Sequence, residues 1–314
     1  MVKQPVNQPS PGYQFFIFSI LSVGIIVLFN LIGLGVCIAV YGLGFVEQLS
    51  RMDLSNPQMP QALYTLQLIS TTLPIFLAPF IYARFILKQP AEYLKPTFRF
   101  NPLLLVIAFF IMMSSTALIE LLANINQKMV LPHWLSGLEN WMKRSEEQAQ
   151  LITKAILKMD TVWDMLKNLF LVGLLTAIVE ELMFRGVLQT IMQKLTKNTH
   201  AAVWITAALF SAFHMEFYGF LPRLLLGALF GYFAAWSGSI WPAIWGHFLN
   251  NGTAVLVTYL FQQKKIKINP DDSHTFTAGG YVFSTIIIII LLLVYKNIAS
   301  GKKQAANING EELG

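Results

Sequence analysis

The sequence predicts an all-α membrane protein, a polytopic bundle of about eight transmembrane helices with one interfacial amphipathic helix. Of its 314 residues, 55% are hydrophobic and only 12% are charged, whereas a soluble domain is about one quarter charged. The mean hydropathy is +0.57. About eight stretches are apolar over roughly 20 residues, the length that crosses the hydrocarbon core of a bilayer.

The apolar stretches divide the chain in order. We expect spans near residues 14–42, 63–87, 102–123, 165–192, 201–215, 219–237, 239–261 and 280–296. The fifth stretch is short and little separates the sixth from the seventh, so seven or nine spans are alternatives. The remaining segments are predicted to be polar tails at 1–12 and 301–314, an interfacial connection at 124–164 and a loop after 261.

The first apolar stretch, from Tyr13 to Phe45, is predicted to remain as a span. A signal peptide has an apolar region of about 7 to 15 residues, and this stretch is more than twice as long. Cys37 lies inside it and is the one cysteine of the chain. The sequence therefore offers neither a disulfide framework nor a thiolate metal site.

The basic residues predict the orientation of the bundle. The formal net charge is +6, but no basic stripe alternates with exposed aromatics as nucleic-acid binding requires. Lys and Arg favour the cytoplasmic side. Two groups place both termini there: Arg84, Lys88, Lys95 and Arg99 after the second span, and Lys296, Lys302 and Lys303 near the end. The group Lys264, Lys265 and Lys267 runs against this orientation.

The connection before the fourth span is predicted to hold an amphipathic helix from Ser145 to Met159. Ser145 and Gln148 have the spacing of a capping box. Apolar residues follow at helical spacing: Leu151, Ile152, Ala155, Ile156 and Met159. We expect this helix to lie at the lipid surface, and a substrate-gating role is the alternative.

The fourth span carries three ionisable residues inside an apolar helix, Glu180, Glu181 and Arg185. A charge at bilayer depth costs about 2.5 to 3.5 kcal/mol on insertion scales, so such residues usually face a protein interior and serve function. The alternative is a helix that ends at Glu180, with Glu181 and Arg185 as an ion pair at the water interface. The same dipeptide at Glu146-Glu147 lies among polar residues and needs no functional explanation.

Two of the five histidines lie in apolar helices, His214 in the fifth span and His247 in the seventh. A single histidine there is more often a packing residue. The two carboxylates, and Asn251 one turn after His247 on the same face, favour a reaction centre instead. Carboxylate and imidazole can activate a water directly or through bound Zn²⁺. An Asn amide can donate to the oxyanion of a tetrahedral intermediate, so the set predicts peptide-bond hydrolysis.

The three motifs, in this order, resemble those of the CAAX prenyl protease and bacteriocin-processing family, also called the Abi family. Each motif lies on its own apolar helix: Glu180, Glu181 and Arg185; Phe210 and His214; His247 and Asn251. The resemblance extends over residues 165–261, while the first three spans show no signature.

This resemblance implies an eight-helix intramembrane endopeptidase. Glu180 with His214 would activate the water, and His247 with Asn251 would stabilise the oxyanion. The other two residues of the first motif would support the site. The implied partners are the bilayer and a membrane-associated or lipid-modified peptide or protein substrate, with no role for nucleic acid.

The sequence leaves alternatives open for both the cofactor and the class of activity. Both a metalloprotease and a metal-independent glutamate mechanism are argued for such enzymes, so Zn²⁺ held by Glu180, His214 and His247 is one alternative. No further His or Cys completes a familiar zinc set. The rival functions are a non-catalytic scaffold or bacteriocin-immunity-like protein, and a transporter with a carboxylate proton relay, for which no inverted repeat is visible.

The sixth span carries small residues at Gly227 and Gly231. Small residues four apart let two membrane helices approach closely. We therefore expect this face to pack against a neighbouring helix.

Overall fold

The structure is a computed structural model that describes residues 8–51, 53, 55–267, 269–270 and 276–308. Every regular element in these residues is helical, which confirms the predicted all-α class. The predicted polar tails lie partly outside the described residues, at 1–7 and 309–314. The last helix continues past the expected boundary at residue 300, to Ile308.

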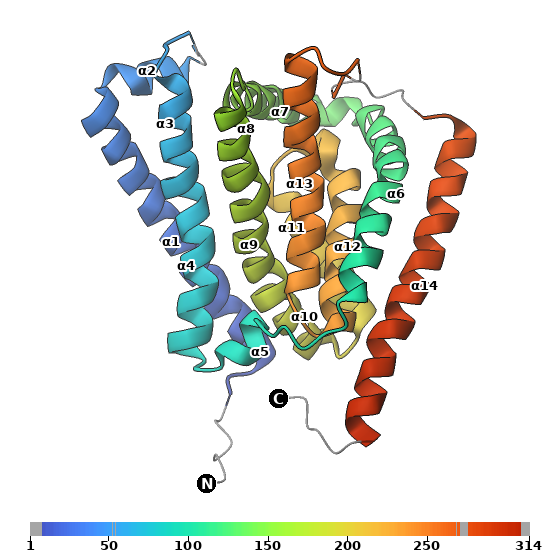
Figure 1. Cartoon of the computed structure of the whole chain (residues 1–314). Helices are drawn as coiled ribbons and strands as arrows, with labels where there is room; N and C mark the ends of the chain where they lie inside the picture. The colour runs from blue at the N-terminus through green and yellow to red at the C-terminus, as the bar shows by residue number, and fades with distance from the viewer. Residues whose placement is uncertain (1–7, 52, 54, 268, 271–275, 309–314) are drawn as a thin grey trace.

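The first half of the chain forms helices on both sides of a central group (Figure 1). Its elements are α1 (Pro11–Tyr41), α2 (Gly44–Ser50), α3 (Met59–Leu66), η1 (Gln67–Thr72), α4 (Leu73–Ile81), η2 (Tyr82–Ile86), α5 (Pro90–Leu94), α6 (Leu103–Gln127), η3 (His133–Leu135) and α7 (Ser136–Ile156).

The second half supplies the central helices and the last outer one (Figure 1). Its elements are α8 (Val162–Asn168), η4 (Leu169–Leu175), α9 (Thr176–Glu181), η5 (Leu182–Leu188), α10 (Gln189–Thr196), α11 (Thr199–Phe213), η6 (Phe217–Gly219), α12 (Phe220–Ser237), α13 (Trp241–Gln262) and α14 (Ala278–Ile308).

Six helical stretches of the described chain are long and apolar enough to cross a membrane. They are Pro11–Tyr41, Met59–Ile86, Leu103–Gln127, Val162–Thr196, Phe217–Ser237 and Ala278–Gly301. Helix α11 is apolar but has only 15 residues. Helix α13 is not one of the six because its His and Asn residues lower its hydropathy. The protein is therefore an integral multi-pass membrane protein, while the count of eight spans is not confirmed.

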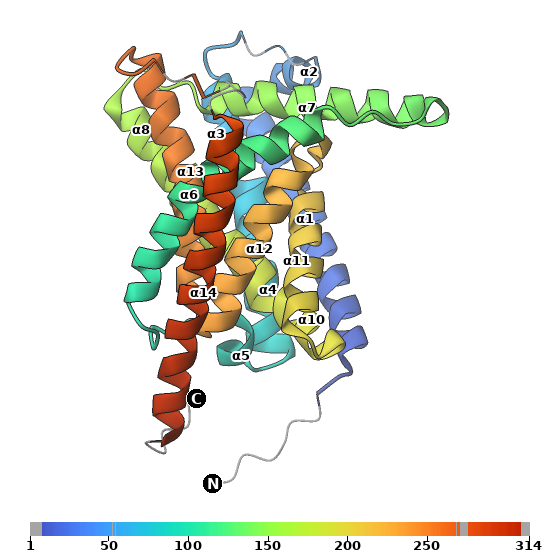
Figure 2. The ribbon, with the colours of Figure 1, turned by 90° about the vertical axis from the view of Figure 1, so that its right-hand side faces the viewer.

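The arrangement of the helices places the central group between two outer layers. Figure 1 shows α1, α3 and α4 along one side, α6 and α14 along the other, and α8 to α13 between them. The most extensive contacts join α11 to α12, α14 to α6, and α13 to η4. The start of α1 and the end of α14 lie at the same end of the bundle (Figures 1 and 2).

Helix α7 lies across the opposite end of the bundle, and one of its ends extends beyond the other helices (Figure 2). It begins at Ser136, so the predicted start at Ser145 with a capping box is wrong. The apolar face of the predicted helix continues toward the N-terminus through Leu138 and Met142, and the helix continues with it. A capping box does occur later, where Thr161 and Asp164 bond reciprocally at the start of α8.

The fourth span changes its helical geometry on both sides of the carboxylates. Segments η4 and η5 are π-helical, and the α-helical turn α9 between them carries the Glu-Glu pair. A π segment widens the helix, redirects backbone carbonyls and occurs often at functional sites. One such carbonyl, that of Val172, accepts a side-chain hydrogen bond from α13.

The glycines of the sixth span confirm the predicted close packing. A Cβ on Gly227 would lie 3.0 Å from the Cα of Ala207, and a Cβ on Gly231 would lie 2.9 Å from the Gln189 Oε1 atom. The backbone of α12 can therefore lie directly against α11 and against side chains of η5 and α10. This contact exposes α12 carbonyls to polar side chains of the fourth span.

Candidate active site

The Glu-Glu pair lies in the interior of the bundle. Glu181 is fully buried, Glu180 is 7% exposed and Arg185 is 1% exposed. The helix continues without a break through η5 and α10 to Thr196. The alternative of a helix that ends at Glu180 with an interfacial ion pair is therefore wrong.

Arg185 is held through its two terminal nitrogens and by the aromatic rings around its guanidinium group. Its Nη1 lies 2.7 Å from Glu181 Oε1, and its Nη2 donates to the carbonyl of Gly227 at 3.0 Å. The guanidinium carbon lies 4.5 Å from the ring centroid of Phe210 and 5.4 Å from that of Phe230. Because a buried charge is tolerated only when it is paired and hydrogen-bonded, this pair fixes the rotamer of Glu181.

Glu181 in turn orients His247. The His247 Nδ1 atom lies 2.8 Å from the same Glu181 Oε1 that binds Arg185. The imidazole also stacks on Phe230, with ring centroids 4.9 Å apart and an interplanar angle of 14°. A carboxylate at Nδ1 fixes the tautomer and direction of the ring. The Nε2 atom of His247 then lies 3.8 Å from Glu180 Oε2.

His214 approaches the same oxygen from the end of α11. Its Nδ1 lies 2.9 Å from the carbonyl of Phe210. A carbonyl only accepts, so Nδ1 carries the proton and Nε2 of the neutral ring presents its lone pair. That Nε2 lies 4.0 Å from Glu180 Oε2. The His214 side chain is 25% exposed, against 9% for Glu180 and 5% for His247, so the cluster is accessible on the His214 side.

The two imidazoles thus face the same oxygen atom of Glu180, Oε2. The separations of 3.8 and 4.0 Å exceed a direct hydrogen bond and lie within the span that a shared water bridges. Glu180 Oε2 is buried and has no hydrogen-bond partner among the described residues. This arrangement can hold and deprotonate a water beside a substrate carbonyl.

Asn251 lies one turn beyond His247 and is held by backbone. Its Nδ2 donates to the carbonyl of Val172 in η4 at 3.2 Å, and its Oδ1 accepts from Asn250 at 3.1 Å. An Asn amide has two N–H groups, so the bond to Val172 leaves the second one to donate. The carbonyl that Asn251 binds lies in the π-helical segment η4.

The structure brings together most of the predicted motif residues, which are Glu180, Glu181, Arg185, Phe210, His214 and His247. Asn251 lies one turn beyond His247 and bonds to η4. The structure also adds residues that the motifs did not predict. Phe230 stacks on His247, Asn250 bonds Asn251, and the Gly227 carbonyl binds Arg185. The small residues of the sixth span signalled close approach, but nothing in that pattern specified which side chains would use it.

The Nε2 atoms of the predicted zinc ligands His214 and His247 lie farther from Glu180 Oε2 than the ligand atoms of one bound zinc ion lie from each other. No group of three or more His, Cys, Asp or Glu side chains in the described chain could hold a metal ion. Ligand atoms around tetrahedral zinc lie about 3.3 Å apart for bonds of about 2.0 to 2.1 Å. The two Nε2 to Oε2 separations are longer, at 3.8 and 4.0 Å. Zinc at Glu180, His214 and His247 stays a prediction.

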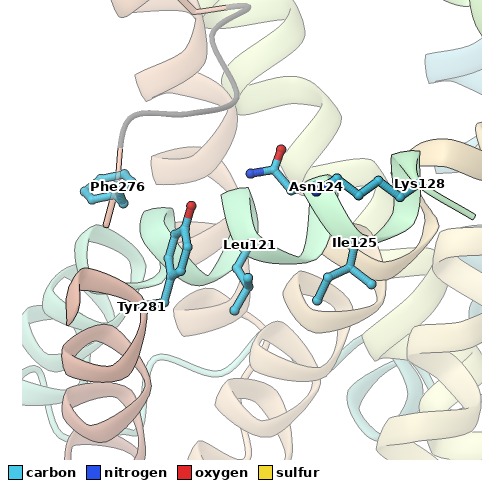
Figure 3. A pocket seen from close by; sticks show the side chains of 6 residues that line it. All are labelled: Leu121, Asn124, Ile125, Lys128, Phe276 and Tyr281. Carbon is cyan, nitrogen blue, oxygen red and sulfur yellow. The ribbon is translucent and has the colours of Figure 1, made fainter. Parts of the chain in front are cut away.

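A pocket of about 280 Å³ lies apart from this cluster, between α6 and the start of α14 (Figure 3). It is lined by Leu121, Asn124, Ile125, Lys128, Phe276 and Tyr281. None of these residues belongs to the carboxylate and histidine cluster, so the pocket is a separate feature.

Comparison with known proteins identifies the segment that carries the cluster. Residues 162–253 match the family model described as type II CAAX prenyl endopeptidase Rce1-like. No match was found among curated proteins or solved structures. The matched range begins at α8 and ends within α13, so it contains all three motifs. Residues 162–253 are therefore similar to the Rce1-like type II CAAX prenyl endopeptidases, in agreement with the resemblance of the motifs.

Proposed function

We propose that the protein is a CAAX-type intramembrane endopeptidase that hydrolyses a peptide bond in a lipid-anchored or membrane-associated peptide. The observation that carries the proposal is the convergence of His214 Nε2 and His247 Nε2 on one buried oxygen of Glu180. The family match supports the reaction class. The position of the cluster inside an apolar bundle supports a substrate that reaches it from the membrane.

In the proposed reaction Glu180 is the general base. A water between Glu180 and His214 loses a proton to the carboxylate, and its oxygen attacks the scissile carbonyl carbon. The tetrahedral oxyanion accepts hydrogen bonds from His247 and from the free N–H of Asn251. Glu180 then returns the proton to the leaving nitrogen as the carbon–nitrogen bond breaks. One water is consumed, and the products are a carboxylic acid and an amine.

Glu181 and Arg185 support this chemistry without touching the reacting atoms. In this proposal the His247 ring carries a proton on both nitrogens, so that Nδ1–H donates to the Glu181 carboxylate and Nε2–H donates to the oxyanion. Arg185 holds the Glu181 carboxylate in place through a 2.7 Å contact. The two glutamates therefore have different tasks, although they are neighbours in sequence.

The rival function is a non-catalytic scaffold, in which the polar cluster only holds helices together. The Arg185, Glu181 and His247 contacts alone would suit that role. Glu180 favours catalysis instead, because its buried Oε2 atom faces the Nε2 atoms of His214 and His247 and makes no direct hydrogen bond in the described chain. The proposal uses that oxygen as the site of proton transfer.

The test is hydrolysis of a farnesylated fluorogenic peptide with a C-terminal CAAX sequence by the purified protein in nanodiscs. Glu180→Gln keeps the shape of the side chain and removes the base, so we expect the rate to fall by about 10² to 10⁴. The matched control is Glu147→Gln, the second glutamate of the same dipeptide on the exposed face of α7. A folded Glu180→Gln protein that cleaves at the rate of the control would refute the assignment.

A further inference from the structure

The turn between α11 and α12 follows directly after His214. It contains Met215, which has a φ of 55°, in the left-handed region that side-chain-bearing residues rarely adopt. A short turn of this kind keeps its conformation only when its surroundings hold it. The groups that hold it therefore also determine where the His214 side chain points.

Asn126, from the C-terminal end of α6, bonds two backbone groups around this turn. Its Nδ2 donates to the carbonyl of Phe217 at 2.9 Å, and its Oδ1 accepts from the N–H of Leu221 at 2.7 Å. Leu221 lies in the first turn of α12, where N–H groups lack partners within the helix. The N-cap residue of α12, Gly219, has no side chain to cap them. Asn126 supplies that cap from 95 positions away in the sequence.

Ser211 holds the same turn from the other side. It lies three residues before His214, is 1% exposed, and donates through Oγ to the carbonyl of Phe220 at 2.7 Å. The ring of Phe217 also packs against Trp141 of α7, with centroids 5.4 Å apart. The end of α11 and the start of α12 are therefore joined by the buried side chains of Ser211 and Asn126.

We propose that Asn126 and Ser211 are positioning residues that hold the turn after His214 and so hold its imidazole against Glu180. The geometric link is short, since the His214 ring is anchored by Nδ1 to the carbonyl of Phe210 in the last turn of α11. Release of the turn frays that last turn and moves Nε2 away from Glu180. The inference rests on the proposed function, because it gives His214 its place in the reaction.

The test variant is Asn126→Ala, and the chain provides a matched control in Asn168→Ala. Asn168 is fully buried, donates to the carbonyl of Ile156 at 3.1 Å and accepts from the Tyr64 hydroxyl at 3.0 Å. Both asparagines thus bridge separate elements, each with one bond donated to a backbone carbonyl and one accepted bond. Asn126 also donates weakly to Met129 Sδ at 3.8 Å. The partners of Asn168 lie outside the turn, so its loss tests the general effect of removing a buried amide.

Two readouts separate positioning from stability, both taken well below the melting temperature of each variant. The first is hydrogen exchange of peptides from residues 207–221, and the second is kcat and KM with the farnesylated peptide in nanodiscs. For Asn126→Ala we expect faster exchange there and a kcat lower by about 10- to 100-fold with KM nearly unchanged. For Asn168→Ala we expect neither change.

Unchanged exchange in Asn126→Ala would overturn the inference, and so would faster exchange with a kcat equal to that of Asn168→Ala. Ser211→Ala removes one hydroxyl and provides a second variant should Asn126→Ala fail to fold. It should show the same two changes at smaller size, and wild-type values for both would count against the proposal. If the wild-type protein does not cleave the peptide, the proposed function fails, while the exchange result still decides whether Asn126 holds the turn.

Discussion

The buried pair Glu181–Arg185 permits a quantitative prediction, because the chain contains an exposed pair with the same spacing and distance. Glu181 and Arg185 are four residues apart, 2.7 Å apart and both fully buried at their side chains. Glu47 and Arg51 are also four residues apart and 2.7 Å apart, but their side chains are 64% and 73% exposed. The two pairs differ in burial and not in contact geometry.

Replacing Arg185 by Met leaves the Glu181 charge buried with only His247 beside it. Loss of one partner of a buried ion pair costs about 3 to 5 kcal/mol, and the Gly227 carbonyl loses its donor as well. Glu181→Gln should be costly for the corresponding reason, since it leaves the guanidinium unpaired. The double variant removes both charges, so its cost should fall short of the sum of the single costs by more than about 1 kcal/mol.

The assay is reversible unfolding in bicelles, which gives the free energy of unfolding for each variant. Removal of either side chain of the exposed pair Glu47–Arg51 should cost at most about 1 kcal/mol. The reasoning is refuted if the single costs at Glu181 and Arg185 add in the double variant within about 0.5 kcal/mol. It is also refuted if the exposed pair costs as much as the buried one.

Three further predictions concern packing, pH and metal. Gly231→Ala should destabilise the bundle by about 1 to 3 kcal/mol in unfolding experiments, because its Cβ would crowd Gln189 and Val203, whereas Gly24→Ala, which meets open space, should not. Burial, and then the charge of Glu216, raises the pKa of Glu146. The folded state therefore binds that proton more tightly than the unfolded state, and stability falls as pH rises through the interval between the two pKa values. At pH values above that interval, Glu146→Gln should melt at a higher temperature than wild type, and below it the two melting temperatures should agree. A difference in melting temperature that does not depend on pH would contradict this prediction. Dialysis against a chelator should leave peptide cleavage intact, and loss of one zinc per chain together with activity would show the opposite.

Local sequence predicted those parts of the fold that depend on hydropathy alone. The long apolar helices appear near their expected positions, because a bilayer span needs a run of about 20 apolar residues. The start of α7 was missed because Ser145 satisfied a local capping pattern inside a helix whose amphipathic face had already begun. Local patterns of this kind do not show which of two candidate starts continues the helix.

The candidate site was predictable as a set of residues and not as a geometry. Glu180, His214 and His247 could be grouped from the motifs because each lies on an apolar helix, where a charged or polar side chain is costly and usually serves function. The roles of Phe230 and Asn126 could not be read in this way. Their partners lie far along the chain, and an aromatic or an Asn at the end of an apolar helix is unremarkable on its own.

The two π-helical segments around α9 have a consequence for how this span keeps its chemistry. A residue in an α-helix advances about 100° around the axis, and a residue in a π-helix advances less. An η4 segment of the same length but with α-helical geometry would therefore turn the Glu-Glu face by about the angle of one residue. Such a chain would keep its apolar profile, its length and every motif residue. Its carboxylates would nevertheless no longer face the histidines. The phase of the helix, set by a segment without any motif residue, is therefore as necessary to the site as the glutamates themselves.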